Sequence, residues 1–224
     1  MTIRKRDVRI PVGEIHLEGI LGYADERAAG PGVLICHPHP QFGGSMDNNV
    51  VWALFDVFTR RGYVAVAFNF RGVGRSGGRY EDGEGEILDV TGVLDWLEEL
   101  PETKGFRLGI LGYSFGAWVG LRAAAKEERV HCVGAVAPPV SMYSFTFLSQ
   151  LRSPLYVVSG SKDPFCSADQ KDSLFEGPRD DRDWKVLEGA DHFFWNHEQE
   201  AAQYLCDAFS THLPTPALAF SFQV

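Results

Sequence analysis

Short apolar segments alternate with longer amphipathic segments over most of the chain, and this alternation limits the folds that the chain can adopt. The apolar segments are GVLICH (32–37), YVAVAFNF (63–70), FRLGILGYS (106–114), VHCVGAVAPP (130–139), PLYVVSGS (154–161) and WKVLEG (184–189). The segments with a helical pattern are 48–62, 86–100, 115–128 and 197–213. Apolar runs of this length are typical of strands that are buried on both faces. The alternation therefore predicts an α/β fold, with a mainly parallel, twisted sheet and helices on both of its faces.

Two extended segments precede this pattern. RKRDVRIPV (4–12) and HLEGILGYA (16–24) flank a Gly-Glu turn and predict an antiparallel hairpin at one edge of the sheet, followed by a polar turn over 24–32. No repeat, low-complexity tract or linker interrupts the sequence, so we expect a single domain over 1–224. The apolar tail 215–224 packs either on the body or on a second subunit, and the sequence leaves both possibilities open.

The composition is that of a globular protein and excludes several classes of partner. Hydrophobic residues make up 45% of the chain and the formal net charge is -9, which argues against a nucleic-acid or membrane-surface binder. The first residues lack the apolar core of a secretory signal, and no run approaches the ~18 apolar residues of a membrane span. The four cysteines are far apart, as expected of buried free thiols. We expect a cytoplasmic protein.

The most specific motif is Gly112-Tyr113-Ser114-Phe115-Gly116, a G-x-S-x-G between a predicted strand and a predicted helix. A serine on such a sharp turn stands clear of the strand ends, and the two glycines make room for the close approach of neighbouring elements. At the helix N-terminus, the Phe115 backbone N–H can stabilise a developing oxyanion. The motif predicts that Ser114 is a nucleophile.

A nucleophilic serine needs a base, and the base needs an acid that orients it. In this fold class the order along the chain is Ser, then Asp or Glu, then His. Asp163 follows the apolar segment 154–161, where it also suits a turn before a proline, and His192 follows the last predicted strand. Asp191 is an alternative acid, but its position beside His192 in sequence suits it poorly to reach the ring. We therefore predict a Ser114–His192–Asp163 triad.

With these residues in place, the chain resembles the α/β-hydrolases, and within them a small cap-less group of predicted hydrolases related to dienelactone hydrolases. The resemblance extends over nearly the whole chain, through HPHPQFGGSMDN (37–48), FNFRGVGRSGG (68–78), GYSFGA (112–117), GSKDP (160–164) and GADHFF (189–194). It implies Ser114 as nucleophile, His192 as general base and Asp163 as its orienting acid. Dienelactone hydrolases carry cysteine at the elbow, where this chain has serine.

The loop CHPHPQFGG (36–44) falls where an α/β-hydrolase supplies the second oxyanion donor. Its prolines have no N–H, which leaves the amides of His39, Gln41 and Phe42 as candidates. His39 and Gln41 are the two preferred choices, and the sequence does not separate them. The pair His37 and His39 could suggest a metal, but zinc needs three or four ligands and no further cluster is present. We expect His37 to fix the loop by hydrogen bonding, and we expect no metal or other cofactor.

A second glycine-rich motif, Gly72–Gly77 (GVGRSG), matches the dinucleotide fingerprint G-x-G-x-x-G. That fingerprint requires a helix to open inside it, whereas here an acidic, glycine-rich segment follows that would repel phosphate. We therefore expect a tight turn over the sheet, which in the resembling family braces the neighbourhood of the active site. Arg71 and Arg75 are expected to form structural ion pairs.

Many α/β-hydrolases insert a helical lid before the strand that carries the acid, but only residues 140–153 are available here. This length predicts an open site without a lid. The segment offers several side chains for the substrate pocket, about half of which we expect to be core residues. These are Met142, Tyr143, Phe145, Phe147 and Leu148.

Together these features predict a serine hydrolase that cleaves a small or medium carboxylic ester, or a thioester, through an acyl-enzyme. A peptidase with the same triad ranks lower because no propeller or cap is present to select peptides. The alternative from another class is a non-catalytic α/β-hydrolase-like protein that binds a small ligand, although such proteins usually lack a triad member. The substrate would be the only small-molecule partner, and the protein a monomer or homodimer.

Overall fold

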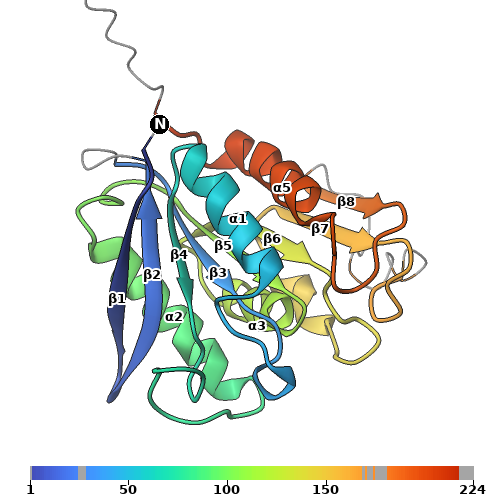
Figure 1. Cartoon of the computed structure of the whole chain (residues 1–224), viewed down its shortest axis with the longest axis horizontal. Coiled ribbons are helices and arrows are strands. Elements are labelled where there is room, and N and C mark those ends of the chain that lie inside the picture. Colours follow the sequence, from blue (N-terminus) through green and yellow to red (C-terminus); the bar gives the residue numbers. More distant parts are fainter. Residues whose placement is uncertain (1, 25–28, 168–169, 171–173, 175–180, 217–224) are drawn as a thin grey trace, which may run out of the picture.

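The computed structural model describes residues 2–24, 29–167, 170, 174 and 181–216. Its centre is one eight-stranded sheet with the strand order β1-β2-β4-β3-β5-β6-β7-β8 (Figure 1). The strands are β1 (Arg4–Val12), β2 (Ile15–Tyr23), β3 (Gly32–Cys36), β4 (Val64–Phe68), β5 (Leu108–Tyr113), β6 (Val130–Val136), β7 (Leu155–Gly160) and β8 (Arg182–Leu187). The predicted polar turn falls partly, and the apolar tail mostly, outside the described residues.

The pairing of the strands is as predicted. β1 and β2 form an antiparallel hairpin, β2 pairs antiparallel with β4, and the pairs from β4 to β8 are all parallel. β3, β4 and β5 are buried at every residue, as expected of strands with a helix layer on each face. In the hairpin at the edge of the sheet, β1 is exposed or half-buried except at Ile10, and β2 is buried at Leu17, Gly19, Leu21 and Gly22.

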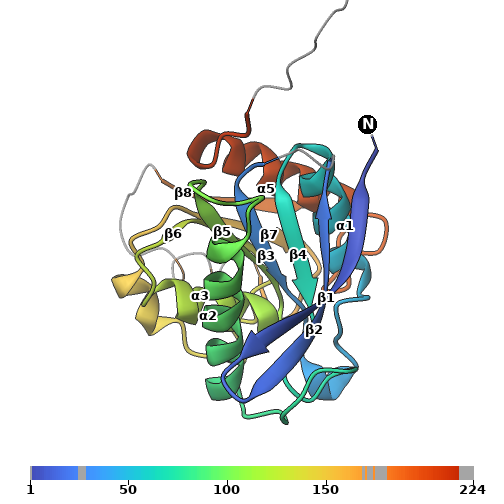
Figure 2. The ribbon, with the colours of Figure 1, turned by 90° about the vertical axis from the view of Figure 1, so that its left-hand side faces the viewer.

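Helices cover both faces of the sheet (Figure 2). They are α1 (Asn49–Arg60), α2 (Glu84–Glu99), α3 (Phe115–Ala124) and α5 (Glu198–His212), with the short 3₁₀ helices η1 (Pro40–Phe42) and η2 (Thr146–Gln150). α1 and α5 pack on one face around a core that includes Phe55, Phe58 and Phe209. α2 and α3 pack on the other face around a core that includes Phe70 and Phe115. The sheet therefore separates two apolar layers.

The fold has no lid. Between the end of β6 and the start of β7 the chain forms only a loop and η2, all within the described residues. The cysteines Cys36, Cys132, Cys166 and Cys206 are free and buried, as predicted. Among the described residues, no helix is both long enough and apolar enough to cross a membrane.

Because β3, β5, β7 and β8 run parallel, their carboxyl ends meet at one edge of the sheet. This is the edge at which open α/β sheets bind their ligands. The loops that follow these four strands carry every residue that the sequence singled out for catalysis.

Candidate active site

Ser114 lies on a sharp turn between β5 and α3. Its backbone has φ 54° and ψ -120°, a conformation that non-glycine residues rarely adopt. A Cβ on Gly112 would overlap the backbone of Gly116 and Ala117, and a Cβ on Gly116 would overlap the carbonyl oxygen of Cys36. The two glycines of the motif are therefore needed to bring α3 against β5 and β3. The strained turn lifts the Ser114 hydroxyl above the strand ends.

Asp163 follows β7, and its carboxylate is buried. Oδ1 accepts a hydrogen bond from the Phe165 backbone N–H at 2.8 Å, which fixes the carboxylate within its own turn. Oδ2 lies 2.9 Å from His192 Nδ1. The turn-forming role and the orienting role that the sequence suggested for Asp163 are thus compatible in one conformation.

His192 lies in the loop between β8 and α5, and its Nε2 is 3.0 Å from Ser114 Oγ. The structure thus brings Ser114, His192 and Asp163 into one hydrogen-bonded chain. The neighbouring Asp191 is exposed, and its carboxylate accepts the Phe193 backbone N–H at 2.9 Å. Asp191 therefore stabilises its own turn, while Asp163 holds the imidazole.

The His-Pro loop, residues 37–44, contains η1 and lines part of the cavity beside Ser114. The Gln41 backbone N–H donates to His39 Nδ1 at 3.2 Å, and the Phe42 N–H donates to the His39 carbonyl oxygen at 3.1 Å. Within the part of the chain that the structure describes, the N–H of His39 and the N–H of Phe115 donate to no group. The geometry therefore distinguishes the two amides that the sequence could not: that of Gln41 is engaged, and that of His39 is free.

His37 anchors this loop to the protein interior. Its ring is buried, Nε2 accepts the Phe70 backbone N–H at 3.0 Å, and Nδ1 lies 2.6 Å from the Pro38 carbonyl oxygen. These two partners require a neutral imidazole with its proton on Nδ1. Burial lowers the pKa of His37 to about 4, which keeps the ring neutral at pH 7. His37 has the loop-fixing role expected from the sequence.

The glycine-rich loop, residues 69–83, leads from β4 to α2. Arg71 pairs with the buried carboxylate of Asp89 at 2.8 Å and with Glu81 at 2.6 Å, while Arg75 pairs with Glu18 at 2.7 Å. Both arginines form structural ion pairs, as expected. α2 begins only after the loop, and its first turn carries Glu84 and Glu86, whose carboxylates would repel a phosphate at this N-terminus.

A cavity of about 400 Å³ opens directly above Ser114. Its described lining is apolar and aromatic, with backbone from the His-Pro loop. The lining residues are Pro38, His39, Phe42, Gly43, Gly44, Asn48, Tyr113, Ser114, Phe115, Pro139, Met142, Tyr143, Phe165, His192 and Phe193. None of these carries an acidic side chain, a lysine or an arginine, so the cavity suits an uncharged group.

The predicted pocket residues divide between this cavity and the core. Met142 and Tyr143 line the cavity. Phe145, which was also predicted for the pocket, is not among the residues that line this cavity. Its ring is buried, packs on Phe147 with 5.7 Å between ring centroids, and lines a separate cavity of about 250 Å³, to which Tyr143 also contributes. Leu148 lines that second cavity too. Phe145 is the N-cap of η2 and Leu148 lies within it, and both side chains pack in the core on the α2 and α3 face of the sheet.

The side chains of several site residues were not predicted from the sequence to take part in the site. Phe42, Phe165 and Phe193 line the cavity, and Tyr113 donates through its hydroxyl to the His192 carbonyl oxygen at 2.7 Å. Tyr80, from the glycine-rich loop, lies 3.1 Å from His39 Nε2. The three phenylalanines are close in sequence to a motif residue, which is a usable signal. Tyr80 is remote from every catalytic motif.

Comparison with known proteins assigns the family. The model of the X-Pro dipeptidyl-peptidase (S15) family matches residues 22–153, more than half of the chain. An uncharacterized protein of Rickettsia prowazekii is 32% identical over 212 residues, which cover 88% of this chain and 89% of that protein. The chain belongs to the α/β-hydrolase superfamily. Within it, the match to the family model makes the chain a member of the S15 family.

Solved structures place this α/β-hydrolase among serine hydrolases without a lid. An α/β serine hydrolase homologue from Coxiella burnetii is 32% identical and covers 90% of this chain and 96% of its own, with a TM-score of 0.77. A lidless α/β serine hydrolase from Xanthomonas campestris is 27% identical and covers 95% and 97%, with a TM-score of 0.82. The predicted fold class, including the absence of a lid, is confirmed.

Proposed function

We propose that this α/β-hydrolase cleaves neutral carboxylic esters of small or medium acyl groups, with thioesters as a second substrate class, through an acyl-enzyme. One observation carries the proposal. The hydrogen-bonded chain of Ser114, His192 and Asp163 lies beside two unpartnered backbone N–H groups, at the floor of an uncharged apolar cavity. A nucleophile, its base and an oxyanion site are the three parts that acyl transfer requires.

In the first half of the proposed reaction, Ser114 Oγ attacks the carbonyl carbon of the ester. His192 Nε2 takes the hydroxyl proton, and Asp163 stabilises the resulting imidazolium through Nδ1–H. The N–H groups of Phe115 and His39 bind the oxyanion of the tetrahedral intermediate. When the intermediate collapses, His192 returns the proton to the leaving alcohol or thiol, and the acyl group stays on Ser114.

In the second half, a water molecule replaces the alcohol. His192 takes a proton from the water as it attacks the acyl carbon, and the same two N–H groups bind the second oxyanion. The collapse of this intermediate returns the proton to Ser114 and releases the carboxylic acid. No metal or cofactor is assigned a role in either half.

The cavity argues for an ester rather than a peptide substrate. A dipeptidyl-peptidase, the activity for which the S15 family is named, acts on peptides with a free N-terminal ammonium group. Binding that group requires a carboxylate, since an unpaired charge is costly to bury. No acidic side chain lines the described cavity, and the carboxylate of Asp163 already pairs with His192. A complete triad with a free oxyanion site also argues against a binding protein without activity.

A substrate panel tests the proposal. Purified enzyme is assayed with p-nitrophenyl esters from acetate to dodecanoate, the corresponding acyl thioesters, and Gly-Pro and Ala-Pro p-nitroanilides, with Ser114→Ala as the matched control. We expect hydrolysis of the shorter esters and thioesters, little cleavage of the anilides, and loss of all activity in Ser114→Ala. Faster cleavage of the X-Pro anilides would overturn the ester assignment in favour of a peptidase. Full activity in Ser114→Ala would overturn the nucleophile.

We further propose that residues 1–224 form one domain, supported by the single continuous sheet. A cytoplasmic location and a monomeric or homodimeric state stay predictions.

A further inference from the structure

The glycine-rich loop hydrogen-bonds to the His-Pro loop at two points, and at a third to Met46, which lies just after that loop. The Phe70 backbone N–H donates to His37, the Asn69 side chain accepts the Met46 backbone N–H at 2.8 Å, and the Tyr80 hydroxyl lies 3.1 Å from His39 Nε2. The first two bonds fix the ends of the His-Pro loop. The third reaches the ring of His39, the residue whose backbone N–H donates to no group among the described residues.

The hydrogen bonds of the His39 ring fix which of its nitrogens accepts and which donates. Nδ1 accepts the Gln41 N–H, and burial lowers the pKa of the ring, so the neutral imidazole carries its proton on Nε2. Nε2–H therefore donates to the Tyr80 hydroxyl oxygen. Burial, with smaller contributions from Tyr143 and Asp82, raises the pKa of Tyr80 to about 12, so the hydroxyl stays protonated.

The ring is also held by packing on three sides. Its centroid lies 4.6 Å from that of Phe42, 4.7 Å from that of Phe115 and 5.2 Å from that of Tyr80. The rings of Tyr80 and Phe115 contact each other as well, at 6.0 Å. Tyr80 therefore contacts both residues whose backbone N–H groups are free, although it lines no part of the described cavity.

We infer that Tyr80 is a positioning residue for the oxyanion site, holding the His39 imidazole so that the His39 backbone N–H points at the oxyanion. This inference rests on the proposed function. An oxyanion donor is effective only within about 2.7–3.1 Å of the developing charge, so the main chain at His39 must be held closely. The hydrogen bond with Tyr80 holds His39 from outside the His-Pro loop. It gives the glycine-rich loop a role in catalysis rather than in nucleotide binding.

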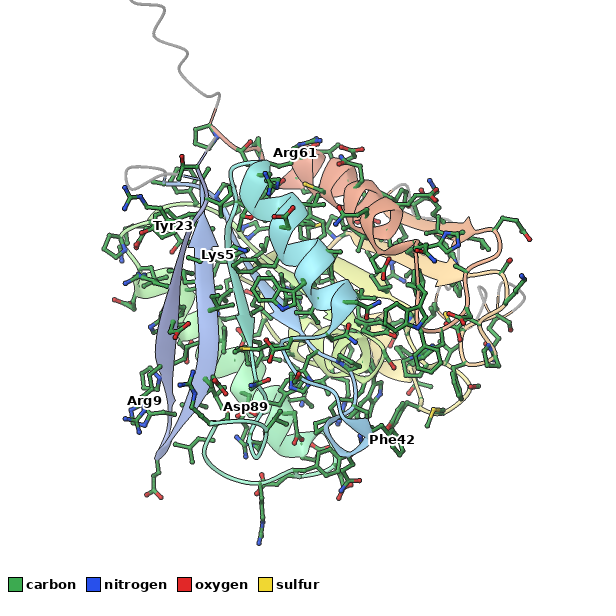
Figure 3. The ribbon with its side chains drawn as sticks, in the orientation of Figure 1. Lys5, Arg9, Tyr23, Phe42, Arg61 and Asp89 are labelled. Carbon is green, nitrogen blue, oxygen red and sulfur yellow. The ribbon has the colours of Figure 1, made fainter. Side chains whose placement is uncertain are left out.

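The first test is Tyr80→Phe, which removes the hydroxyl and keeps the ring packing. With p-nitrophenyl butyrate we expect kcat to fall about tenfold, because a small misplacement of a catalytic group is costly, while KM stays within about twofold. Binding of a trifluoromethyl ketone, which forms a tetrahedral adduct with its own oxyanion, should weaken by a similar factor. The matched control is Tyr23→Phe on β2, far from Phe42 and the site (Figure 3), which should leave both values unchanged.

A double-mutant cycle separates positioning from general loss of stability. His39→Leu keeps the backbone N–H but removes both ring nitrogens, and we expect it also to lower kcat about tenfold. If Tyr80 acts through His39, the double variant should be no slower than His39→Leu alone. Thermal melts should show all variants folded at the assay temperature.

The outcomes are distinguishable. Wild-type kcat and inhibitor affinity in Tyr80→Phe, or additive losses in the double variant, would overturn the role of Tyr80 and leave the proposed function standing. A wild-type protein without activity on the ester panel would overturn the proposed function itself, and the positioning role would fall with it.

Discussion

The triad edge and the His-Pro loop face the same cavity, but they are built from different chemical groups. At the triad edge, three side chains follow three strands and contact one another directly, with separations of 3.0 and 2.9 Å. In the His-Pro loop, the proposed oxyanion donor is the backbone amide of His39, and Tyr80 from the glycine-rich loop contacts the ring of that residue. A substitution at the triad edge therefore removes a reacting group itself, whereas most substitutions near the His-Pro loop only alter the contacts that position its amide. We expect a larger loss of kcat from the first kind than from the second.

The largest effect we expect is from Asp163→Asn at the triad edge. The amide cannot stabilise the imidazolium and favours the wrong tautomer of His192, so kcat should fall by roughly 10⁴ with the fold retained. Steady-state kinetics with p-nitrophenyl butyrate measure this.

Asp191→Asn is the matched control, because it changes the adjacent carboxylate, which accepts the Phe193 backbone N–H within its own turn. We expect its kcat to remain within about threefold of wild type, as is usual for an exposed substitution. An equal loss in both variants would remove the distinction between the two acids.

The second prediction removes the backbone donor of the His-Pro loop. His39 has φ -55°, which proline can adopt, so His39→Pro keeps the local backbone and loses the N–H together with the ring. We expect kcat to fall by about 10²–10³, the usual cost of one oxyanion donor. His39→Leu loses only the ring and should be about tenfold slower than wild type. If the two variants had the same kcat, the His39 N–H would not be the donor.

The third prediction concerns the anchoring of that loop by His37. Its pKa is lowered from 6.5 to about 4 in the folded protein, so the unfolded chain binds a proton below pH 6.5 that the folded protein does not bind. The contribution of His37 to the free energy of unfolding is therefore fully present above pH 6.5 and is lost as the pH falls toward 4. The expected loss between pH 7 and pH 5 from this residue is about 2 kcal/mol.

Urea unfolding at the two pH values measures this loss for the wild type and for His37→Asn. The variant should lose less stability than the wild type between pH 7 and pH 5. An equal loss in both would show that His37 does not determine the acid sensitivity.

The smallest effect we expect is on acyl-chain preference. Phe42, on η1 at the edge of the molecule (Figure 3), is 78% exposed and lines the cavity. Phe42→Ser should reduce kcat/KM for p-nitrophenyl hexanoate relative to acetate by about fivefold, because part of an apolar contact is lost. Leu88→Ser on α2 is the control, since this exposed leucine lies outside the described lining of the cavity. A change in chain preference in Leu88→Ser would point to a general effect of surface polarity.

The sequence predicted the triad edge more completely than the His-Pro loop, for a physical reason. Ser114 directly follows β5, while Asp163 and His192 lie in the loops that follow β7 and β8. A parallel sheet brings such positions together at one edge. The choice between His39 and Gln41 depends on a bond from one residue to the ring of another within a 3₁₀ turn, which no pattern of residue types encodes. Tyr80 comes from a loop whose path over the sheet is set by tertiary packing.

The residues that line the cavity could likewise be predicted from the sequence only in part. The sequence placed aromatic residues between β6 and β7, but the path of the loop before η2 decides that Tyr143 lines the cavity while Phe145 is buried in the core. Phe165 and Phe193 line the cavity because the acid turn and the histidine loop fold beside it. Side-chain direction in irregular segments follows from the folded loops rather than from residue type.

The central claim is that Ser114 is a nucleophile activated by His192. Reaction with a fluorophosphonate probe, followed by intact mass measurement and peptide mapping, tests it most directly, because such probes modify activated serines independently of the natural substrate. We predict one adduct per chain, located on Ser114, and none in Ser114→Ala or in denatured protein. A folded wild-type protein that remains unlabelled, or an adduct on another residue, would contradict the account.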